Sequence, residues 1–456
     1  MTATGAAGAP ARRTPLVLRN RRFGAVWTAQ VLTQAAGRMF QVGAVWWLIA
    51  HAAGSDRGLA SGAFLAVSTL PAVVLAPLVA GLIARRPHRA VLGVSAAVAG
   101  LVALGTAAWT SATTPPALVT YGAALVLAGC QAVFDPCLTT AVPELVEDAD
   151  IEAATGFELA TQSLAGLAGG LLGPLVVDAT GLAGVVAGCA GAYLLAAAVI
   201  GVTRFPAAPA AAATADAPTT DAPTADAAPA AGRPLRRILA ELPFIRRVLL
   251  CFTAANVFTT AVFVVMPLYT RTVLHADGST VAALEAALGA GTLVGSFTGG
   301  RLPGAPTAVG AGCLALMAAA LGLPGLVGDR AGQATAVGSM ALAGWCVGVI
   351  GVRFVALFQR MVPAEDRPGF FAVMQALLGA TFPVSSLVFG LLGDHLPART
   401  LCLVQAVGVL PVAAALWWTG RRHTPATDTD ADAGAATTTV TAAATAVSAE
   451  PIGGGR

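Results

Sequence analysis

Charged residues are scarce in this chain of 456 residues, where Asp, Glu, Lys and Arg together account for 11% of the sequence. Soluble globular proteins carry roughly 25% charged residues. The mean hydropathy of +0.77 and the 56% share of hydrophobic residues agree with this scarcity. The composition excludes a water-soluble globular fold and predicts that much of the surface faces lipid.

Lysine is absent, so all 26 basic residues are arginines. With the N-terminus inside, twenty of them fall in inner segments, four in outer segments and two within apolar spans. The positive-inside rule therefore predicts a multi-pass protein of the cytoplasmic (inner) membrane with both termini in the cytoplasm. The first 22 residues contain no apolar core, so we expect no cleavable signal peptide. Because the arginines follow the positive-inside rule, the net charge of +3 does not indicate nucleic-acid binding, and we expect no nucleic-acid partner.

The sequence also lacks the residue groupings that enzymes and metal proteins use. Its seven cysteines are scattered through apolar segments without a Cys-x-x-Cys pair, which predicts buried free thiols. The five histidines fall in loops or at span ends, which argues against an intramembrane histidine relay. No nucleophile–base set or phosphate-binding loop is apparent, so we expect neither an enzyme nor a cofactor or metal site.

Apolar runs long enough to cross about 30 Å of hydrocarbon recur along the chain and predict an all-α membrane protein. We expect twelve transmembrane helices, at residues 23–50, 58–84, 90–110, 117–142, 157–178, 181–203, 248–270, 279–300, 306–327, 333–358, 369–393 and 397–419.

A repeat at half length predicts two related six-helix bundles. Arg21-Arg22 and Arg246-Arg247 each open an apolar span that carries a threonine and an amide, and the two phrases lie 225 positions apart. The predicted organisation is a cytoplasmic tail (1–22), an N-terminal bundle (23–203), a cytoplasmic linker (204–247), a C-terminal bundle (248–420) and a disordered tail (421–456).

The linker divides into two parts by composition. Residues 206–232 are an Ala/Pro/Thr/Asp tract with little to bury, which predicts disorder. Residues 235–247 combine arginines with apolar residues and are read either as an amphipathic helix on the inner leaflet or as a merely basic span flank.

Four polar residues form a stripe on the first span, because Gln30, Gln34, Arg38 and Gln41 are spaced three or four residues apart. The functional interpretation is a stripe lining an aqueous cavity, with Arg38 near mid-membrane contacting an anionic or polar substrate. The alternative is a structural hydrogen-bond network between helices. The repeat-related seventh span carries the uncharged set Thr253, Asn256 and Thr260, and Phe263 occupies the place of Arg38.

Charges within other spans are candidates for coupling and gating, since a charge inside the bilayer needs a partner or water. Asp135 and Arg353 lie at similar depth in spans four and ten. We hypothesise an ion pair between them that closes the cytoplasmic side and breaks on protonation of Asp135; local pairing within each bundle is the alternative. Glu158 and Glu285 are weaker candidates.

Glycines and one tryptophan complete the candidate residues. Span five carries small residues at helical spacing, which predicts a flat face for close packing, whether sliding or static: Gly166, Gly169, Gly170, Gly173 and Pro174. Trp345 lies mid-way along span ten, unlike the other tryptophans near span ends, and is read either as a substrate-stacking residue or as a packing residue.

Several phrases resemble the major facilitator superfamily of secondary transporters. They are Gly81-Leu-Ile-Ala-Arg85-Arg86-Pro-His-Arg89 after span two, Phe134-Asp-Pro136 in span four, and Gln359-Arg-Met-Val-Pro363 followed by Arg367-Pro-Gly369 after span ten. The family pattern after span two is Gly-x-Leu-Ala-Asp-Arg-x-Gly-Arg, so Gly81, Arg86 and Arg89 match, whereas Arg85 replaces the aspartate and His88 the glycine. That aspartate helps close the cytoplasmic gate in the family, so another contact must do so here.

The resemblance is greatest to the bacterial efflux branch of enterobactin-exporter and macrolide-efflux-like proteins. It implies twelve helices in two six-helix pseudo-symmetric halves around a mid-membrane site with alternating access. We therefore expect a proton-coupled exporter of a small amphipathic compound, such as a drug, antibiotic or siderophore-like metabolite, acting as a monomer. The alternatives are an importer or facilitator of the same fold, and a non-transporting membrane sensor or scaffold.

Overall fold

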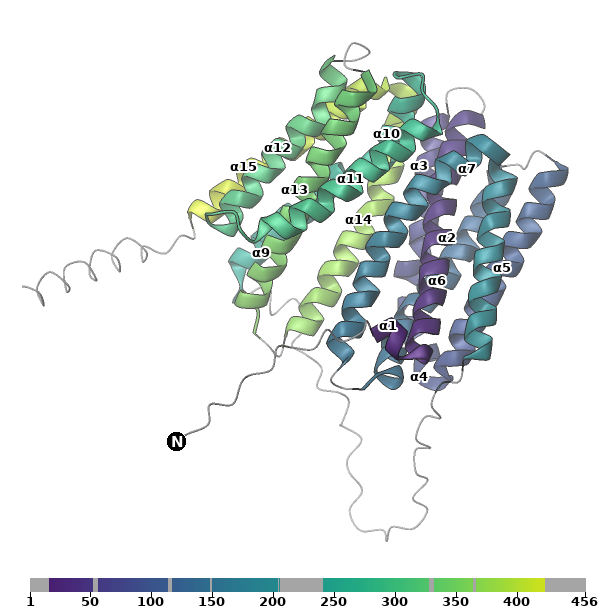
Figure 1. Ribbon diagram of the computed structural model, residues 1–456. Helices are drawn as coiled ribbons and strands as arrows, with labels where there is room; N and C mark the ends of the chain where they lie inside the picture. Colours follow the sequence, from purple (N-terminus) through teal and green to yellow (C-terminus); the bar gives the residue numbers. More distant parts are fainter. Residues whose placement is uncertain are drawn as a thin grey trace, which may run out of the picture.

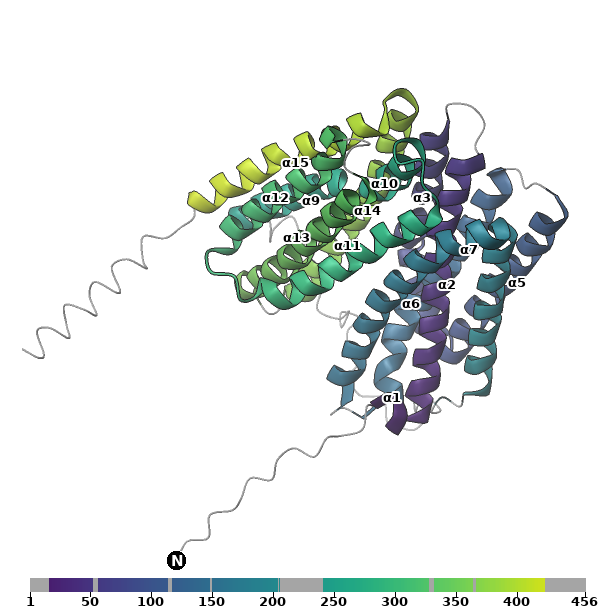
Figure 2. The same cartoon turned by 45° about the horizontal axis from the view of Figure 1, so that its top comes forward.

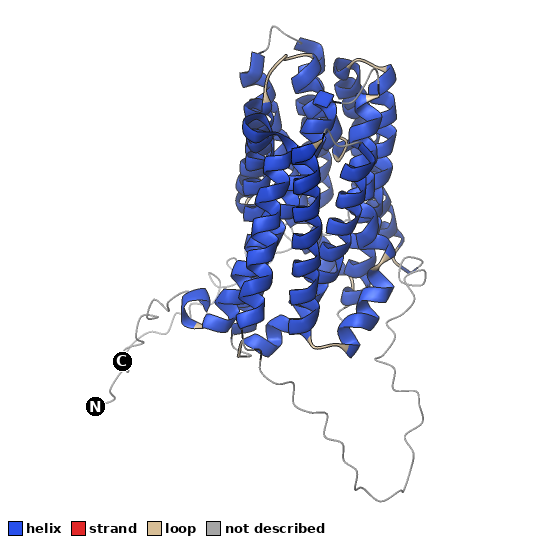
Figure 3. Ribbon diagram, turned by 90° about the vertical axis from the view of Figure 1, so that its right-hand side faces the viewer, coloured by secondary structure: helices blue, strands red, loops and turns tan. Residues whose placement is uncertain are grey.

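The computed structural model describes residues 16–51, 56–113, 117–147, 150–203, 205, 241–327, 332–363 and 366–422. Within these ranges the chain forms helices joined by short turns, without any strand (Figure 3). This confirms the predicted all-α architecture. The tract predicted to be disordered in the linker, the C-terminal tail beyond residue 422 and residues 235–240 of the predicted amphipathic helix lie outside the described residues.

The N-terminal group of helices comprises α1 (Leu16–Arg19), α2 (Arg21–His51), α3 (Arg57–Val74), α4 (Ala76–Arg85), α5 (His88–Ala112), α6 (Ala117–Leu145) and α7 (Ile151–Val202). α3 and α4 form one span that is interrupted at Leu75. α7 contains two predicted spans, because its backbone turns at Gly181, where φ is 70°. A positive φ of this size favours glycine, which has no Cβ to clash.

The C-terminal group comprises α9 (Pro243–Thr259), α10 (Val262–Thr272), α11 (Gly278–Gly299), α12 (Pro306–Val327), α13 (Gly332–Met361), α14 (Arg367–His395) and α15 (Ala398–Arg421). α9 and α10 form one span that is interrupted at Thr260 and Ala261.

Within the part of the chain that the structure describes, these helices make up twelve membrane-crossing segments, as predicted. Ten segments among the described residues meet the length and hydropathy expected of a membrane span, and α7 is counted once among them. α2 is not among the ten although it is 31 residues long. Its polar stripe lowers its hydropathy, so the helix that departs most from a simple membrane span is the one predicted to carry the site.

The two groups of helices meet through α3 with α14, α7 with α11, and α10 with α2 (Figure 1). These contacts concentrate at the end where α3 and α11 begin and α10 and α14 finish, which we call the closed end. The opposite end carries α1 and residues 85–89, and we call it the arginine-rich end. Figure 2 shows the two groups diverging toward the arginine-rich end.

Backbone lies directly against backbone where α3 crosses α14, and we call this contact the glycine seam. It consists of Gly58 and Gly62 on α3 and of Ser386, Gly390 and Gly393 on α14. A Cβ added to Gly390 would lie 2.7 Å from the carbonyl oxygen of Gly58, and one added to Gly62 would overlap the carbonyl oxygen of Ser386. Residues without side chains are therefore required for the two groups to approach this closely.

The close packing of the glycine seam predicts that one added methyl group lowers the stability of the protein. Gly62→Ala should destabilise the folded protein by about 1–3 kcal/mol, because the added Cβ meets backbone that cannot rotate away. The measurement is the thermal unfolding midpoint of the purified protein in detergent. Gly105→Ala is the matched control, since a Cβ there meets nothing within 4 Å. Equal midpoints for the two variants would contradict the close packing described here.

Candidate functional site

A cavity of about 700 Å³ lies between the two groups of helices. This volume is within the range of small-molecule sites, roughly 300–1,000 Å³. Most of the wall comes from α2, α3, α6 and α7, and α14 contributes Leu378, Gly379 and Phe382 from the C-terminal group. The polar side chains of the wall are Gln34, Arg38, Gln41, Ser68, Thr69, Gln131, Asp135 and Tyr193.

Three of the four residues of the predicted α2 stripe line this cavity, namely Gln34, Arg38 and Gln41. Helical spacing places them on one face, and that face is turned toward the space between the two groups. Gln30 is buried instead, and its Nε2 atom has no hydrogen-bond partner among the described residues.

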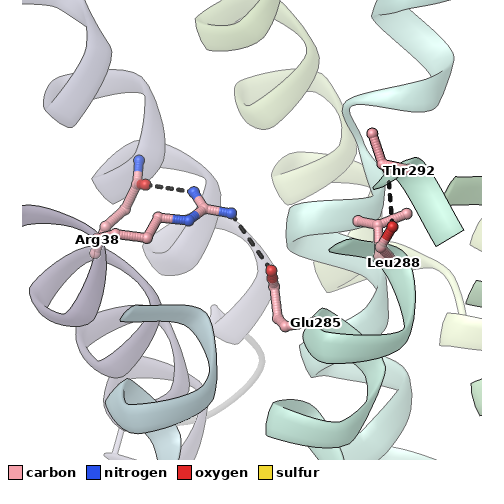
Figure 4. A network of polar contacts seen from close by, with 5 residues as sticks. Arg38, Glu285, Leu288 and Thr292 are labelled. Atoms are coloured by element: carbon pink, nitrogen blue, oxygen red, sulfur yellow. Dashed lines mark hydrogen bonds and ion pairs between the residues drawn. The ribbon is translucent and has the colours of Figure 1, made fainter. Parts of the chain in front are cut away.

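Arg38 joins the two groups of helices through its guanidinium group (Figure 4). Nη1 donates a hydrogen bond to Gln41 Oε1 at 2.7 Å, on the same helix. Nη2 lies 3.4 Å from Oε2 of Glu285, on α11 of the other group. The guanidinium carbon is 4.9 Å from the ring centroid of Phe263, which adds a cation–π contact. Both charged side chains are largely buried, so each depends on the other for compensation.

Sequence reasoning treated Arg38 and Glu285 separately and missed their pairing. The two residues are 247 positions apart, and only the docking of α11 against α2 and α7 brings them together. The repeat contained one indication of which residues surround Arg38. Phe263 takes the place of Arg38 in the second half, and the structure places these two side chains in contact.

The glycines of α7 make room for this ion pair. A Cβ on Gly169 would lie 2.6 Å from Arg38 Cβ, and one on Gly170 would lie 3.2 Å from Glu285 Oε2. Gly173 packs against the backbone of Gly43 on α2, where a Cβ would lie 2.9 Å from its nitrogen. Gly166 differs, because it lines the cavity and faces open space. The carbonyl oxygen of Pro174 lies against the start of α11.

Asp135 lies in the cavity wall within a cluster of amides. Its Oδ1 atom accepts hydrogen bonds from Gln131 Nε2 at 2.6 Å and from Gln34 Nε2 at 3.2 Å. Both donors belong to the N-terminal group, from α6 and α2. These two amide donors hold the Asp135 carboxylate in position in the cavity wall.

Arg353 lies on α13 and donates a hydrogen bond to the carbonyl oxygen of Leu302, within the C-terminal group. Its Nε atom is buried without a partner among the described residues. In this conformation Asp135 and Arg353 each have a partner within their own group of helices. Glu158 belongs to α7, but its side chain is outside the described part of the structure.

The polar residues of the seventh span bind within the C-terminal group. Asn256 Nδ2 donates to Thr381 Oγ1 at 2.5 Å and to the carbonyl oxygen of Leu378 at 3.2 Å. Thr260 and Thr253 donate to backbone carbonyls of their own span. None of the three lines the cavity, although Asn256 holds the part of α14 that does.

Trp345 also lies away from the cavity. Its Nε1 donates to Thr298 Oγ1 at 3.0 Å, and its backbone packs against Gly291 and Gly295 of α11. Its place in the structure is that of a packing residue between α11 and α13.

The loop phrase after span two lies at the arginine-rich end. Gly81 and Arg85 belong to the last turns of α4, and a Cβ on Gly81 meets nothing within 4 Å. Arg86 is extended and follows α4, while Arg89 in α5 donates to the carbonyl oxygen of Gly201 at the end of α7.

Tyr193 is a cavity residue that the sequence reasoning did not identify. The residue is 2% exposed, and its buried hydroxyl has no hydrogen-bond partner among the described residues. A buried hydroxyl without a partner is costly. The sequence offered one signal, because Tyr193 is one of three tyrosines in the chain.

Comparison with known proteins identifies the relatives of this architecture. Residues 26–338 match the family model described as Major Facilitator Superfamily. A solved structure of an auto-inhibited peptide transporter of the POT family is 13% identical, with a TM-score of 0.66, over 90% of this chain and 98% of that chain. A bacterial homologue of the human lysosomal transporter Spinster, solved in an inward-facing and unoccupied conformation, is 12% identical, with a TM-score of 0.65, over 88% and 97%.

A D-xylose–proton symporter is 14% identical, with a TM-score of 0.60, over 88% of this chain and 97% of that chain. At these identities the likeness concerns the fold alone, and it confirms the fold class predicted from the sequence. No curated protein sequence matches the chain.

The ion pair predicts energetic coupling across the two groups of helices. Arg38→Gln and Glu285→Gln should each destabilise the protein, because each leaves one buried charge without its partner. The double variant should lose less than the sum, with a coupling free energy of about 0.5–3 kcal/mol. Thermal unfolding of the four proteins measures this cycle. Arg38→Gln combined with Glu144→Gln, which changes an exposed carboxylate elsewhere, is the control cycle, and additive effects in both cycles would contradict the coupling.

Proposed function

The chain belongs to the major facilitator superfamily, and we propose on this basis that it is a secondary active transporter that works by alternating access across the cytoplasmic membrane. A cavity of transporter dimensions between two groups of membrane-spanning helices supports this proposal. The groups are in contact at one end and diverge at the other, as expected for a carrier in one of its two extreme conformations (Figure 2).

We further propose that the conformation described here faces the cytoplasm. The arginine-rich end is the end that the positive-inside rule assigns to the cytoplasm, and the two groups of helices diverge there. On α3 the cavity residues, from Ser68 to Val73, lie on the side of the glycine seam that faces the arginine-rich end, so the seam separates the cavity from the closed end.

The chemistry of the cavity wall supports a small amphipathic substrate. Apolar groups such as Phe40, Leu127 and Phe382 provide a surface for rings and alkyl chains. Arg38 and Asp135, with the amides beside them, provide hydrogen bonds and one charge of each sign. A drug-like metabolite, antibiotic or siderophore fits this combination, and export is the proposed direction.

Proton antiport is the proposed driving reaction, with Asp135 as the group that exchanges the proton. It is a carboxylate in the cavity wall, where both substrate and water have access, and its amide partners hold it in place. Protonation of Asp135 by the external solution and its release to the cytoplasm would couple the proton gradient to the change of conformation. Glu285 is the second candidate, because protonation would release Arg38 from it.

The test is accumulation of candidate compounds in cells with and without the protein, repeated in the presence of a protonophore. Export predicts lower accumulation in cells that contain the protein, and the protonophore should abolish the difference. Higher accumulation would indicate import, and no change for any compound would favour the non-transporting alternative.

Asp135→Asn should abolish uphill export in the same assay, while Asp277→Asn, at an exposed residue of the closed end, should leave it intact. Uphill export by Asp135→Asn would exclude Asp135 as the coupling group.

Asp135 and Arg353 are also proposed to pair when the cytoplasmic side closes, as each now has a local partner that it would exchange. Asp135→Arg and Arg353→Asp should each abolish transport, since a like charge then faces its partner. The double reversal should restore a substantial part of the rate of substrate movement down its gradient. Absence of any rescue, with both proteins folded and in the membrane, would argue against the pair.

A further inference from the structure

Two carboxylates at the closed end each bind the first turn of a helix in the other group. Asp178, on α7, accepts a hydrogen bond from the backbone N–H of Gly278, the first residue of α11, at 2.5 Å. Asp394, on α14, accepts hydrogen bonds from the backbone N–H groups of Gly58 and Leu59, in the first turn of α3, at 2.7 and 3.0 Å.

These two helices lack a side-chain cap of their own. The residue preceding α3 is Asp56 and the residue preceding α11 is Asp277, and neither caps its helix through its side chain. The carboxylate of Asp277 accepts a hydrogen bond from Ser279 instead. The first N–H groups of a helix have no partner within the helix and carry a partial positive charge. For α3 and α11 these groups are bound by an aspartate from the opposite group of helices.

The two contacts occupy corresponding positions in the two halves of the chain. Residues 170–173 of α7 and residues 390–393 of α14 share the sequence Gly-Leu-Leu-Gly, 220 positions apart. The starts of the two capped helices, Gly58 and Gly278, are separated by the same interval. Asp394 follows its Gly-Leu-Leu-Gly phrase directly and Asp178 lies four residues later relative to its own, which is about one helical turn and places both on the same helix face.

The contact of Asp178 is also connected to the cavity. Its Oδ1 atom accepts a hydrogen bond from Trp46 Nε1 on α2 at 2.7 Å, so one carboxylate joins α2, α7 and α11. Glu285 lies seven residues after Gly278 on α11, about 10 Å along the helix, and pairs with Arg38 on α2. α11 is thus bound to the N-terminal group at two points, one at the closed end and one in the cavity wall.

We propose that Asp178 and Asp394 are positioning residues of the transport cycle, a pair of symmetry-related contacts that hold the closed end shut and must both release before the cavity opens there. The inference rests on the proposed alternating access. Each carboxylate reaches its helix only while α7 lies against α11 and α14 lies against α3, so separation of the two groups exposes both helix starts to water. Because the groups move as bodies, loss of one contact weakens the other.

The test is hydrogen–deuterium exchange, measured by mass spectrometry on the full-length protein in lipid nanodiscs. Asp178→Asn and Asp394→Asn each remove the charge and one acceptor oxygen. Each variant should raise the exchange rate about fivefold at the start of α3 and also at the start of α11. Each should slow exchange at the arginine-rich end, around residues 85–90 and 366–371, because the population shifts toward a state closed there.

Asp277→Asn is the matched control, since it removes a carboxylate at the same helix start that makes no contact between the groups. It should leave exchange at α3 and at the arginine-rich end unchanged. Asp178→Glu and Asp394→Glu keep the charge, so their exchange rates should be closer to that of the unaltered protein than those of the Asn variants are. This difference between Glu and Asn variants separates the loss of a contact from misfolding.

Faster exchange confined to the helix whose cap was altered would show that the two aspartates are static caps and would overturn the proposal, as would unchanged exchange. The readout does not involve transport. If the protein moves no solute but each variant still changes exchange at both helix starts, the proposed function is disproved and the paired contacts are retained. If the protein transports actively but each variant changes exchange only at its own helix, the transport function is retained and the paired contacts are disproved.

Discussion

An arginine in the middle of a membrane bundle requires compensation, and the contact between Arg38 and Glu285 is the interaction on which the arrangement of the site depends. A charge at the bilayer centre costs on the order of 2.5–3.5 kcal/mol when it has no partner. Here the partner comes from the other group of helices, so the two groups must be docked for Arg38 to be compensated. The glycines of α7 follow from the same requirement, because side chains at Gly169 or Gly170 would occupy the space of the pair.

The internal repeat explains which features are shared by the two halves and which are not. Both halves supply a glycine-rich helix that meets the other half at the closed end, and both supply an aspartate that caps a helix across the interface. The cavity departs from this symmetry. Its charged side chains, Arg38 and Asp135, both belong to the N-terminal group, and the equivalent of Arg38 is Phe263. A shared mechanism of movement is thus combined with a site that is polar on one side and largely apolar on the other.

The sequence predicted those features that depend on local order along the chain. The apolar runs predicted the twelve spans. The spacing of Gln30, Gln34, Arg38 and Gln41 predicted one polar face, and all of these except Gln30 line the cavity. Features that depend on how the helices dock against one another could not be predicted from the sequence. The partner of Asn256 is Thr381, 125 positions away, and nothing in either segment indicates that they meet. Asp178 and Asp394 were not among the candidate residues, since each binds a helix start that lies 100 or more positions away in the chain.

The glycine seam has a consequence for the entropy of closure. Most protein interfaces order rotatable side chains when they form, at roughly 0.5–1.5 kcal/mol for each flexible side chain that becomes fixed. Gly58, Gly62, Gly390 and Gly393 have no side chains to order, so α3 and α14 come together and separate without that penalty. Dispersion and backbone contact stabilise the seam, and no side-chain rotamer of these glycines has to be ordered each time the contact forms. An interface of this composition is suited to being formed and broken many times rather than once.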